Sequence, residues 1–328
     1  MKGASSMLDR LYDAKFRGIV LQVLLLVALA ALFYVIASNT AANLARQNVT
    51  SGFGFLDRTA GFDISQKLIA YENTSTFWRA FWVGLANTLL VACIGIVLAT
   101  LLGFAIGLAR LSSNWLVAQL AAVYVEIVRN VPLLLFLLFW YFAVLRSLPM
   151  PLESYELWGG IFLNRRGFYF PSPFDGSMPY LGRFNVEGGM VIQPEFAALL
   201  VGLVVYTAAF IGEIVRSGIL GVPKGQREAA AALGLSHAQT LRLIIIPQAL
   251  RIIIPPLTNQ YLNLTKNSSL AVAIGYPDLV SVFSGTVLNL SNQAVEVILI
   301  TMAVYLTLSL LISLAMNLLN ARMALVER

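Results

Sequence analysis

The candidates for binding a polar solute are five polar or charged residues that lie within strongly apolar segments of the sequence. Glu126 and Arg129 are three residues apart, a spacing that places both side chains on one face of a helix. Lys266, Asn267 and Ser268 form a polar run in another apolar segment. Because a charge in hydrocarbon costs roughly 2.5–3.5 kcal/mol even on lenient scales, such residues are functional candidates by default. An arginine fork can bind both oxygens of a carboxylate, and the polar run can hydrogen-bond a zwitterion.

Each of these residues also has a purely structural interpretation, and the sequence leaves both open. Glu126 and Arg129 can neutralise each other near a helix break before Pro132, or Arg129 can meet the carboxylate of a solute. Lys266 can line a solvated pathway, or its long side chain can reach the membrane surface. Three further carboxylates near the ends of apolar segments are interpreted as boundary residues that water or head groups reach: Glu195, Glu213 and Glu296.

The sequence contains no motif for catalysis or for binding a nucleotide. A phosphate-binding loop of the form G-x-x-x-x-G-K-[ST] is missing, and so are a nucleophile elbow, a zinc motif and a dinucleotide fingerprint. His237 has no metal-ligand spacing around it, and Cys93, the single cysteine, is expected to serve in helix packing. We therefore expect no enzyme activity and no cofactor on this chain, and any use of ATP must rest with a partner.

The elements that must position the candidate residues are membrane helices. The chain is 59% hydrophobic and only 12% charged, whereas soluble domains carry about 25% charged residues. A hydrocarbon core of about 30 Å needs about 20 apolar residues in a helix. Gly103 and Gly107, four residues apart in one such segment, are typical of a close helix-packing face. We predict an all-α, polytopic bundle of about six transmembrane helices, over 19–37, 84–108, 117–145, 195–215, 257–276 and 295–319.

The basic residues predict how these helices are oriented. The net charge of +6 is spread over loops that flank the apolar segments, so membrane topology explains it and nucleic-acid binding is not expected. The first apolar segment is long for a cleaved signal peptide and is expected to remain as a helix. Four cations before it place the N-terminus in the cytoplasm: Lys2, Arg10, Lys15 and Arg17. Both termini and 216–256 are then cytoplasmic, and 38–83, 146–194 and 277–294 lie outside.

Residues 149–193 differ in composition from the sequence around them. They contain five prolines, several glycines and clustered aromatic residues, a composition typical of an ordered loop rich in turns. This external insertion is either a structural cap or a docking surface for an extracytoplasmic partner, and the sequence does not separate the two. We divide the chain into an N-terminal tail, first helix and external loop over 1–83, followed by a core over 84–328 that contains this insertion.

The polar stretch between the fourth and fifth apolar segments is predicted to form two short helices at the cytoplasmic surface. Pro223 suits a first helical turn, and Gly234 suits a left-handed C-terminal cap. Ser236 and Gln239 have the spacing of a capping box, which begins a second helix that we expect to end at Pro247. The alanine-rich first helix leaves room for another surface to approach its backbone closely.

This stretch resembles the signature of permease subunits of binding-protein-dependent ABC importers. The family pattern is Glu-Ala-Ala, three residues, Gly, nine residues, Ile, one residue and then Leu-Pro. The matching residues here are Glu228, Ala229, Ala230, Gly234, Ile244 and Pro247. The sequence departs from the pattern only at Ile246, where leucine is usual. The resemblance implies that the stretch is a coupling helix that inserts into a groove of an ATPase subunit.

Other stretches narrow the resemblance. Asn87–Leu89, Glu126–Leu133 and Lys266–Leu270 are similar to polar amino-acid permeases of the HisQ/HisM-like family. Ser51–Leu56, Gly61–Ile64 and Asn164–Pro171 resemble general L-amino-acid permeases of the Aap/Bzt type. The resemblance implies a type I ABC importer permease in the bacterial inner membrane, with ATP and magnesium held by a partner ATPase dimer. It also implies a second, homologous permease subunit and a periplasmic binding protein that delivers the amino acid.

Two other functions remain as alternatives. An ion-coupled secondary transporter would use intramembrane carboxylates as proton relays, but only Glu126 qualifies and Arg129 can neutralise it. A membrane scaffold without transport activity would not need the polar residues of the third and fifth apolar segments. The sequence does not indicate which amino acids are carried.

Overall fold

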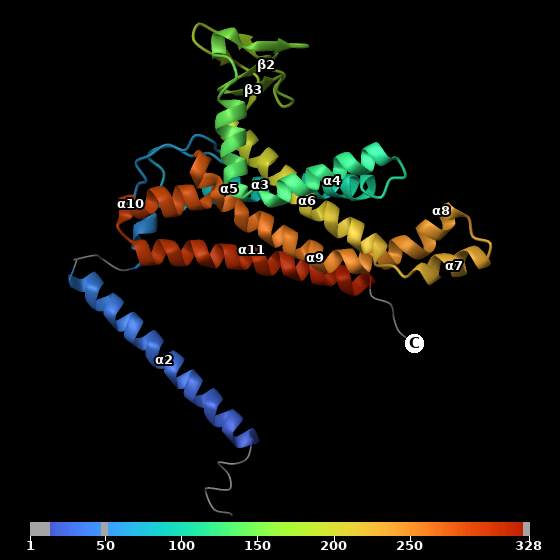
Figure 1. Ribbon diagram of the computed structural model, residues 1–328. Helices are drawn as coiled ribbons and strands as arrows, with labels where there is room; N and C mark the ends of the chain where they lie inside the picture. Colours follow the sequence, from blue (N-terminus) through green and yellow to red (C-terminus); the bar gives the residue numbers. More distant parts are fainter. Residues whose placement is uncertain (1–13, 47–51, 324–328) are drawn as a thin grey trace, which may run out of the picture. The chain divides into compact units, whose positions relative to one another are not determined.

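The computed structural model describes residues 14–46 and 52–323 (Figure 1). These belong to two compact units, Met1–Phe53 and Gly54–Arg328. The first unit contains one helix, α2 (Ala14–Arg46), whose apolar side chains are mostly exposed, as they are in a helix that faces lipid. It contains the predicted span 19–37 and extends it at both ends. Three residues named in the sequence analysis lie outside the described residues: Lys2, Arg10 and Ser51.

The second unit is built from long helices. The described residues of the two units contain five helices that are long and apolar enough to cross a membrane. The number is six when one bent pair of helices is counted as a single span. Because five of the six predicted segments fall largely or wholly within single long helical runs, the predicted helical bundle is confirmed. The principal helices are α3 (Phe77–Ala109), α4 (Trp115–Asn130), α5 (Leu133–Leu138), α6 (Pro194–Leu220), α9 (Ile246–Asn267) and α11 (Ala294–Met323).

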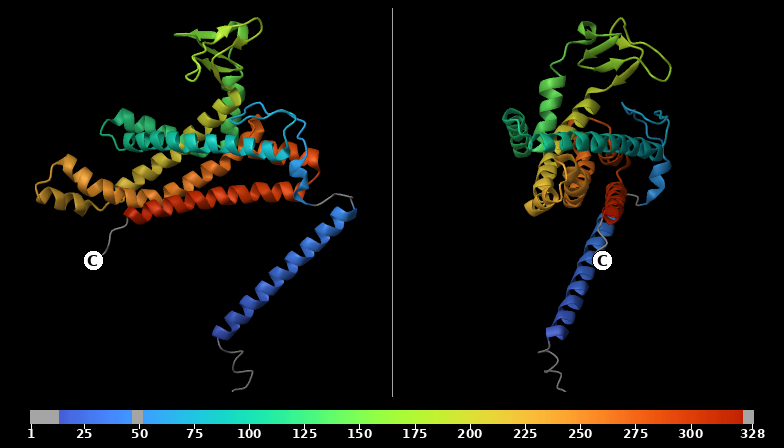
Figure 2. Two further views of the ribbon diagram at one scale, coloured as in Figure 1. Left: turned by 180° about the vertical axis from the view of Figure 1, so that it is seen from behind. Right: turned by 90° about the vertical axis from the view of Figure 1, so that its right-hand side faces the viewer.

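The third predicted segment, 117–145, is not one continuous helix but a bent pair of helices. α4 ends at Asn130, and α5 with its π-helical continuation η2 (Phe139–Leu145) turns away by 108°. The cause is Pro132, which has no N–H to continue the helix and forces Val131 into an extended conformation (φ −99°, ψ 132°). Figure 2 shows α5 rising from the end of α4 instead of continuing along it.

The predicted packing face on α3 is confirmed, and its partner is α6. A Cβ on Gly103 would lie 2.5 Å from Cβ of Ile211, and a Cβ on Gly107 would lie 2.6 Å from Cβ of Val215. Only glycine permits this approach of two helix backbones. α6 is the helix with the largest buried share of its apolar window, 61%.

Residues 149–193 contain two small antiparallel sheets, which the prediction of a turn-rich loop missed. The larger has the order β1 (Tyr155–Leu157), β2 (Ile161–Asn164), β3 (Gly167–Phe170) and β6 (Met190–Ile192). The smaller pairs β4 (Tyr180–Leu181) with β5 (Val186–Glu187). Phe162, Tyr169 and Val186 are buried together between them. This β-domain stands beyond the free end of η2 and the start of α6 (Figures 1 and 2).

The irregular segment 54–76 packs on the ends of α3 and of the helical segments that follow α9. Phe55 is fully buried against Phe77 and Phe283. Asn87 in α3 donates from Nδ2 to the carbonyl of Gln66 (2.9 Å), which ties the segment to the bundle. The remaining short elements here are η1 (Phe53–Asp57), η5 (Ser268–Ile274), η6 (Val280–Val287) and α10 (Leu288–Ser291).

Candidate functional site

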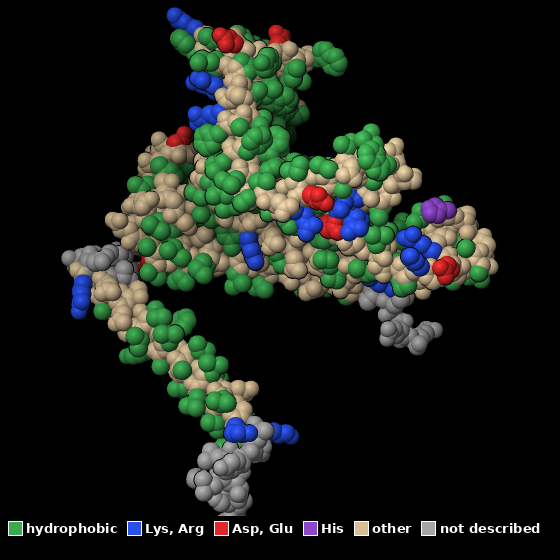
Figure 3. Space-filling view, in the orientation of Figure 1, with side chains coloured by type: hydrophobic (Ala, Val, Ile, Leu, Met, Phe, Trp, Pro, Cys, Tyr) green, Lys and Arg blue, Asp and Glu red, His purple; other side chains and the backbone are tan. Residues whose placement is uncertain are grey.

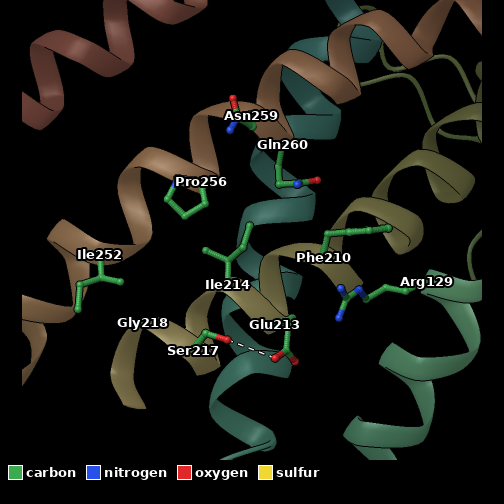
Figure 4. Close-up of a pocket in the computed structure, with 10 residues that line it drawn as sticks. All are labelled: Arg129, Phe210, Glu213, Ile214, Ser217, Gly218, Ile252, Pro256, Asn259 and Gln260. Atoms are coloured by element: carbon green, nitrogen blue, oxygen red, sulfur yellow. Dashed lines mark hydrogen bonds between the residues drawn. The ribbon is translucent and has the colours of Figure 1, made fainter. Parts of the chain in front are cut away.

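A cavity of about 350 Å³ lies between α4, α6 and α9 (Figure 4). Its wall combines one cation, one carboxylate, two amides and a hydroxyl with apolar side chains. Such a mixture suits a small zwitterionic solute, and the volume lies within the roughly 300–1,000 Å³ usual for small-molecule sites. The lining residues are Arg129, Phe210, Glu213, Ile214, Ser217, Gly218, Ile252, Pro256, Asn259 and Gln260.

Arg129 is the cation of this cavity. It stands in the last turn of α4, and its guanidinium carbon lies 5.2 Å from the centre of the Phe210 ring, a cation–π contact. Within the described part of the chain it forms no ion pair, and the pairing with Glu126 that the sequence allows is not made. Glu126 is exposed instead, and its carbonyl accepts a hydrogen bond from Asn130. The fork of Arg129 is therefore available for an anion.

Glu213 is the carboxylate of the cavity, a place that its sequence interpretation as a boundary residue did not include. Its Oε2 accepts from Arg110 at the end of α3, and its Oε1 lies 2.7 Å from Nη2 of Arg216. Ser217 donates to the same Oε1 at 3.2 Å. Glu213 is thus neutralised and oriented by two arginines, and it joins α3 to α6 beside the cavity. Figure 3 shows acidic and basic side chains gathered on the surface over α4 and α6.

α9 supplies the opposite wall of the cavity and is altered there by two consecutive prolines. Pro255 and Pro256 lie inside the helix, so the carbonyls of Arg251 and Ile252 lose the N–H donors of the regular α-helical pattern. Ile252 and Pro256 both line the cavity. A carbonyl without its helical donor can accept a hydrogen bond from an ammonium group, so the wall opposite Arg129 can receive the other end of a zwitterion.

The predicted polar run lies elsewhere. Lys266 lines a separate cavity of about 360 Å³ between the end of α9, η6 and α11, so the structure does not bring it together with Arg129. Asn267 is half-buried at the last position of α9. Ser268 is fully buried and donates to the carbonyl of Thr265 (2.8 Å). The two predicted groups of solute-binding residues therefore lie in two separate parts of the fold.

The polar stretch after α6 forms the predicted helical hairpin. α7 (Lys224–Ala232) is followed by Gly234 at φ +73° and then by α8 (His237–Thr240). The capping box is present: Gln239 N donates to Ser236 Oγ (3.3 Å), and Ser236 N donates to Gln239 Oε1 (2.8 Å). In Figure 3 the single histidine marks the exposed surface of this hairpin.

The expected end of the second helix at Pro247 is wrong. The chain passes from α8 through the π-helical turn η4 (Leu241–Ile245) directly into α9, and Pro247 lies in the first turn of that helix. Proline is tolerated there because a first-turn N–H needs no helical acceptor. Of the other matched residues, Glu228 and Ala229 are exposed, Ala230 is fully buried, and Ile244 packs against the core.

Comparisons with known proteins agree with this architecture. The chain is 49% identical to the general L-amino acid transport system permease protein AapQ of Rhizobium johnstonii, over 97% of this chain and 95% of that protein. It is 48% identical to the putative amino-acid ABC transporter permease protein YhdX of Escherichia coli K12, over 95% of each chain. A crystal structure of an amino acid ABC transporter with histidines matches with a TM-score of 0.57 and 28% identity, over 75% of this chain and 95% of that one. Residues 99–325 match the model of the binding-protein-dependent transport system inner membrane component. The chain therefore belongs to that family and is a multi-pass protein of the inner membrane.

Proposed function

We propose that this chain is the transmembrane permease subunit of an ABC importer that carries L-amino acids across the bacterial inner membrane. The observation that carries the proposal is the direct continuity between the exposed α7–α8 hairpin and two helices of the Arg129 cavity. α6 ends at Leu220 and α7 begins at Lys224, whereas η4 continues into α9. The relative at 49% identity, a general L-amino acid transport system permease protein, supports the substrate class.

The hairpin is the docking element for a partner ATPase. Leu233 and Leu243 are 79% and 62% exposed, so they offer apolar side chains to a groove on another protein. Ala229 adds little bulk, and buried Ala230 holds α7 against its own core. ATP and magnesium are bound by the ATPase dimer. Closure of that dimer moves the hairpin, and α6 and α9 move with it because no flexible linker separates them.

The Arg129 cavity is the substrate-binding site within the bundle. Arg129 binds the carboxylate of the amino acid through its fork. The ammonium group faces the wall formed by Glu213, Ser217 and the carbonyl groups beside Pro256. Movement of α6 against α4 changes the distance between these two walls, so the conformation of the hairpin controls how well the zwitterion is held. The binding site then opens alternately to the two sides of the membrane.

The hairpin end of the bundle faces the cytoplasm, and the β-domain faces the periplasm. Arg251 Nε donates to the carbonyl of Met323 (2.7 Å), which places the end of α11 at the hairpin end. Basic residues of this end support the orientation by the positive-inside rule: Arg216, Lys224, Arg227, Arg242 and Arg322. A periplasmic amino-acid-binding protein then delivers its ligand at the β-domain side, and a second, similar permease completes the pathway.

Reconstitution of the chain with its copurifying subunits tests the proposal. Uptake of radiolabelled L-amino acids into proteoliposomes should require ATP and the binding protein. Glu228→Lys reverses a charge on the exposed face of α7, and Gly234→Pro is incompatible with φ +73°. Both variants should retain assembly but lose most ATP-driven uptake, whereas Glu156→Lys in β1 should transport normally. Unchanged uptake by both hairpin variants would remove the coupling role, and uptake driven by an ion gradient without an ATPase would indicate a secondary transporter.

A further inference from the structure

A third cavity, of about 530 Å³, lies between the β-domain, the segment 54–76 and the start of α6. None of its lining residues belongs to the Arg129 cavity. Its wall contains three arginines, one glutamate and several neutral polar groups. The lining residues are Ser65, Tyr141, Arg146, Arg165, Arg166, Tyr169, Val191, Gln193, Pro194 and Glu195.

The three arginines are held in place by their backbones and by aromatic contacts. Arg165 N donates to the carbonyl of Pro149 (3.0 Å) and Arg166 N to Oδ1 of Asn164 (2.8 Å), which fixes the β2–β3 turn. Arg146 follows η2, and its guanidinium carbon lies 5.4 Å from the centre of the Tyr141 ring. Among residues 14–46 and 52–323, none of the three forms an ion pair with a carboxylate. Figure 3 shows basic side chains along one flank of the β-domain.

The cavity also holds one carboxylate at a defined position. Glu195 Oε1 accepts a hydrogen bond from the Tyr141 hydroxyl (2.9 Å), which in turn accepts one from Arg146 Nη2 (3.5 Å). The lining therefore carries three positive charges and one negative charge. Gln193, the residue that precedes α6, donates its side chain to the carbonyl of Ser65 (2.9 Å) and does not cap the helix. The positive end of the α6 dipole adds to the attraction for an anion.

We propose that this cavity is a binding site for an acidic L-amino acid, which it holds on the outer side of the bundle before transfer to the Arg129 cavity. This inference rests on the proposed function. The arrangement matches a solute with two carboxylates and one ammonium group: the arginine forks bind the carboxylates and Glu195 binds the ammonium. A neutral amino acid offers one carboxylate to the three guanidinium groups and an acidic amino acid offers two, so the cavity favours a solute with a second carboxylate. An acidic side chain of a docked protein would use the arginines but not Glu195.

Chemical protection tests the site directly and does not depend on transport. The purified full chain in nanodiscs is treated with phenylglyoxal, which modifies accessible arginines, and each position is quantified by mass spectrometry. L-Glutamate should slow modification of Arg146, Arg165 and Arg166 with a saturating dependence on concentration, and L-glutamine should protect much less. Arg183 is the matched control because it is exposed in the same β-domain, stacks on Phe184 (5.4 Å) and does not line the cavity. Equal rates with and without L-glutamate would overturn the proposal.

Transport kinetics provide the second test. In proteoliposomes, the double variant Arg165→Gln, Arg166→Gln should raise the KM for L-glutamate about tenfold, the loss expected from one charge-assisted contact. The KM for L-glutamine should change little, and Arg183→Gln should behave like the original chain. Loss of uptake for both amino acids to the same extent, or weaker docking of the binding protein at unchanged L-glutamate protection, would overturn the proposal. Failure of the original chain to transport any amino acid would refute the proposed function instead, and the protection experiment would still decide whether the site exists.

Discussion

Replacement of Gly107 by alanine should destabilise the contact between α3 and α6. The new Cβ would lie 2.6 Å from Cβ of Val215 and 2.8 Å from the carbonyl oxygen of Gly212. Non-bonded carbons attract best at about 3.5–4.0 Å, so the two helices must separate by about 1 Å. The contact atoms are the Cβ and Cγ1 of the β-branched Val215 and the backbone oxygen of Gly212, so no long flexible side chain can move aside. Overpacking of this kind costs about 1–3 kcal/mol.

Gly225→Ala in α7 is the matched control, because nothing lies within 4 Å of the Cβ it would add. Both changes replace a helical glycine by alanine. Each variant therefore gains at most about 1 kcal/mol in helix propensity, and this gain cancels when the two are compared. One kcal/mol shifts the Tm by about 2–4 °C in a domain of some 150–250 residues. We therefore expect the Tm of Gly107→Ala to lie about 2–12 °C below that of Gly225→Ala. The measurement is thermal unfolding of the purified full chain in one detergent.

The same substitution should also disturb the Arg129 cavity. Gly212 and Val215 flank Glu213 on α6, so a displacement of this turn moves the carboxylate of the cavity wall. We expect the KM for amino-acid uptake to rise in Gly107→Ala relative to the original chain. The reasoning would be refuted by a Gly107→Ala protein that melts at or above the temperature of the control.

Two further predictions concern charged side chains. Arg129→Gln should raise the KM for amino-acid uptake about tenfold or more, because the contact with the carboxylate is lost. Lys266→Ala changes a separate cavity and should raise the KM less. A larger effect of Lys266→Ala in the same uptake assay would contradict the assignment of the substrate site to Arg129. Burial raises the pKa of Asp278, in the segment before η6, from 3.8 to about 7. The folded protein thus keeps a proton that the unfolded chain releases, so the contribution of Asp278 to the free energy of unfolding is full below pH 3.8 and is lost as the pH rises through about 7. Unfolding measured from pH 4 to pH 8 should not show this loss in Asp278→Asn and should show it in Asp175→Asn, whose carboxylate is exposed; a loss of equal size in both variants would contradict the assignment.

The helices could be predicted from the sequence where one property, the length of an apolar segment, decides the structure. The predicted segments 195–215 and 295–319 lie inside α6 and α11. Apolar length says nothing about direction, so 117–145 was predicted as one span: hydrophobic residues continue on both sides of Pro132 although the chain bends there by 108°. The helix break that the sequence suggests before Pro132 was considered only for the surroundings of Arg129. The strands of the β-domain were not predicted for a different reason. Its strands are two to four residues long, which is too short for an alternating pattern to stand out.

Parts of the site that depend on local chemistry were also predictable. The capping box of Ser236 and Gln239 and the positive φ of Gly234 follow from residue type and spacing alone. The role of Glu213 does not, because one of its partners, Arg110, is 103 residues away in the sequence. A sequence shows that a carboxylate is close to the end of an apolar segment, but it does not show which cation the fold brings to it. For the same reason the helical spacing of Glu126 and Arg129 suggested a pair that the structure does not form.

α6 connects the three places to which function is assigned. Its first turn contains Glu195 of the outer arginine cavity, and its other half contains Glu213 of the Arg129 cavity. Eighteen residues of helix separate the two carboxylates, a rise of about 27 Å. Beyond Leu220 the chain enters the α7–α8 hairpin within a few residues. Because the α3 glycines and the Arg110–Glu213 ion pair lock α6 to α3, a force on the hairpin moves this pair of helices together. The wall that changes relative to Glu213 is then the one formed by α4, whose Arg129 stands just before the break at Pro132, where the chain can pivot.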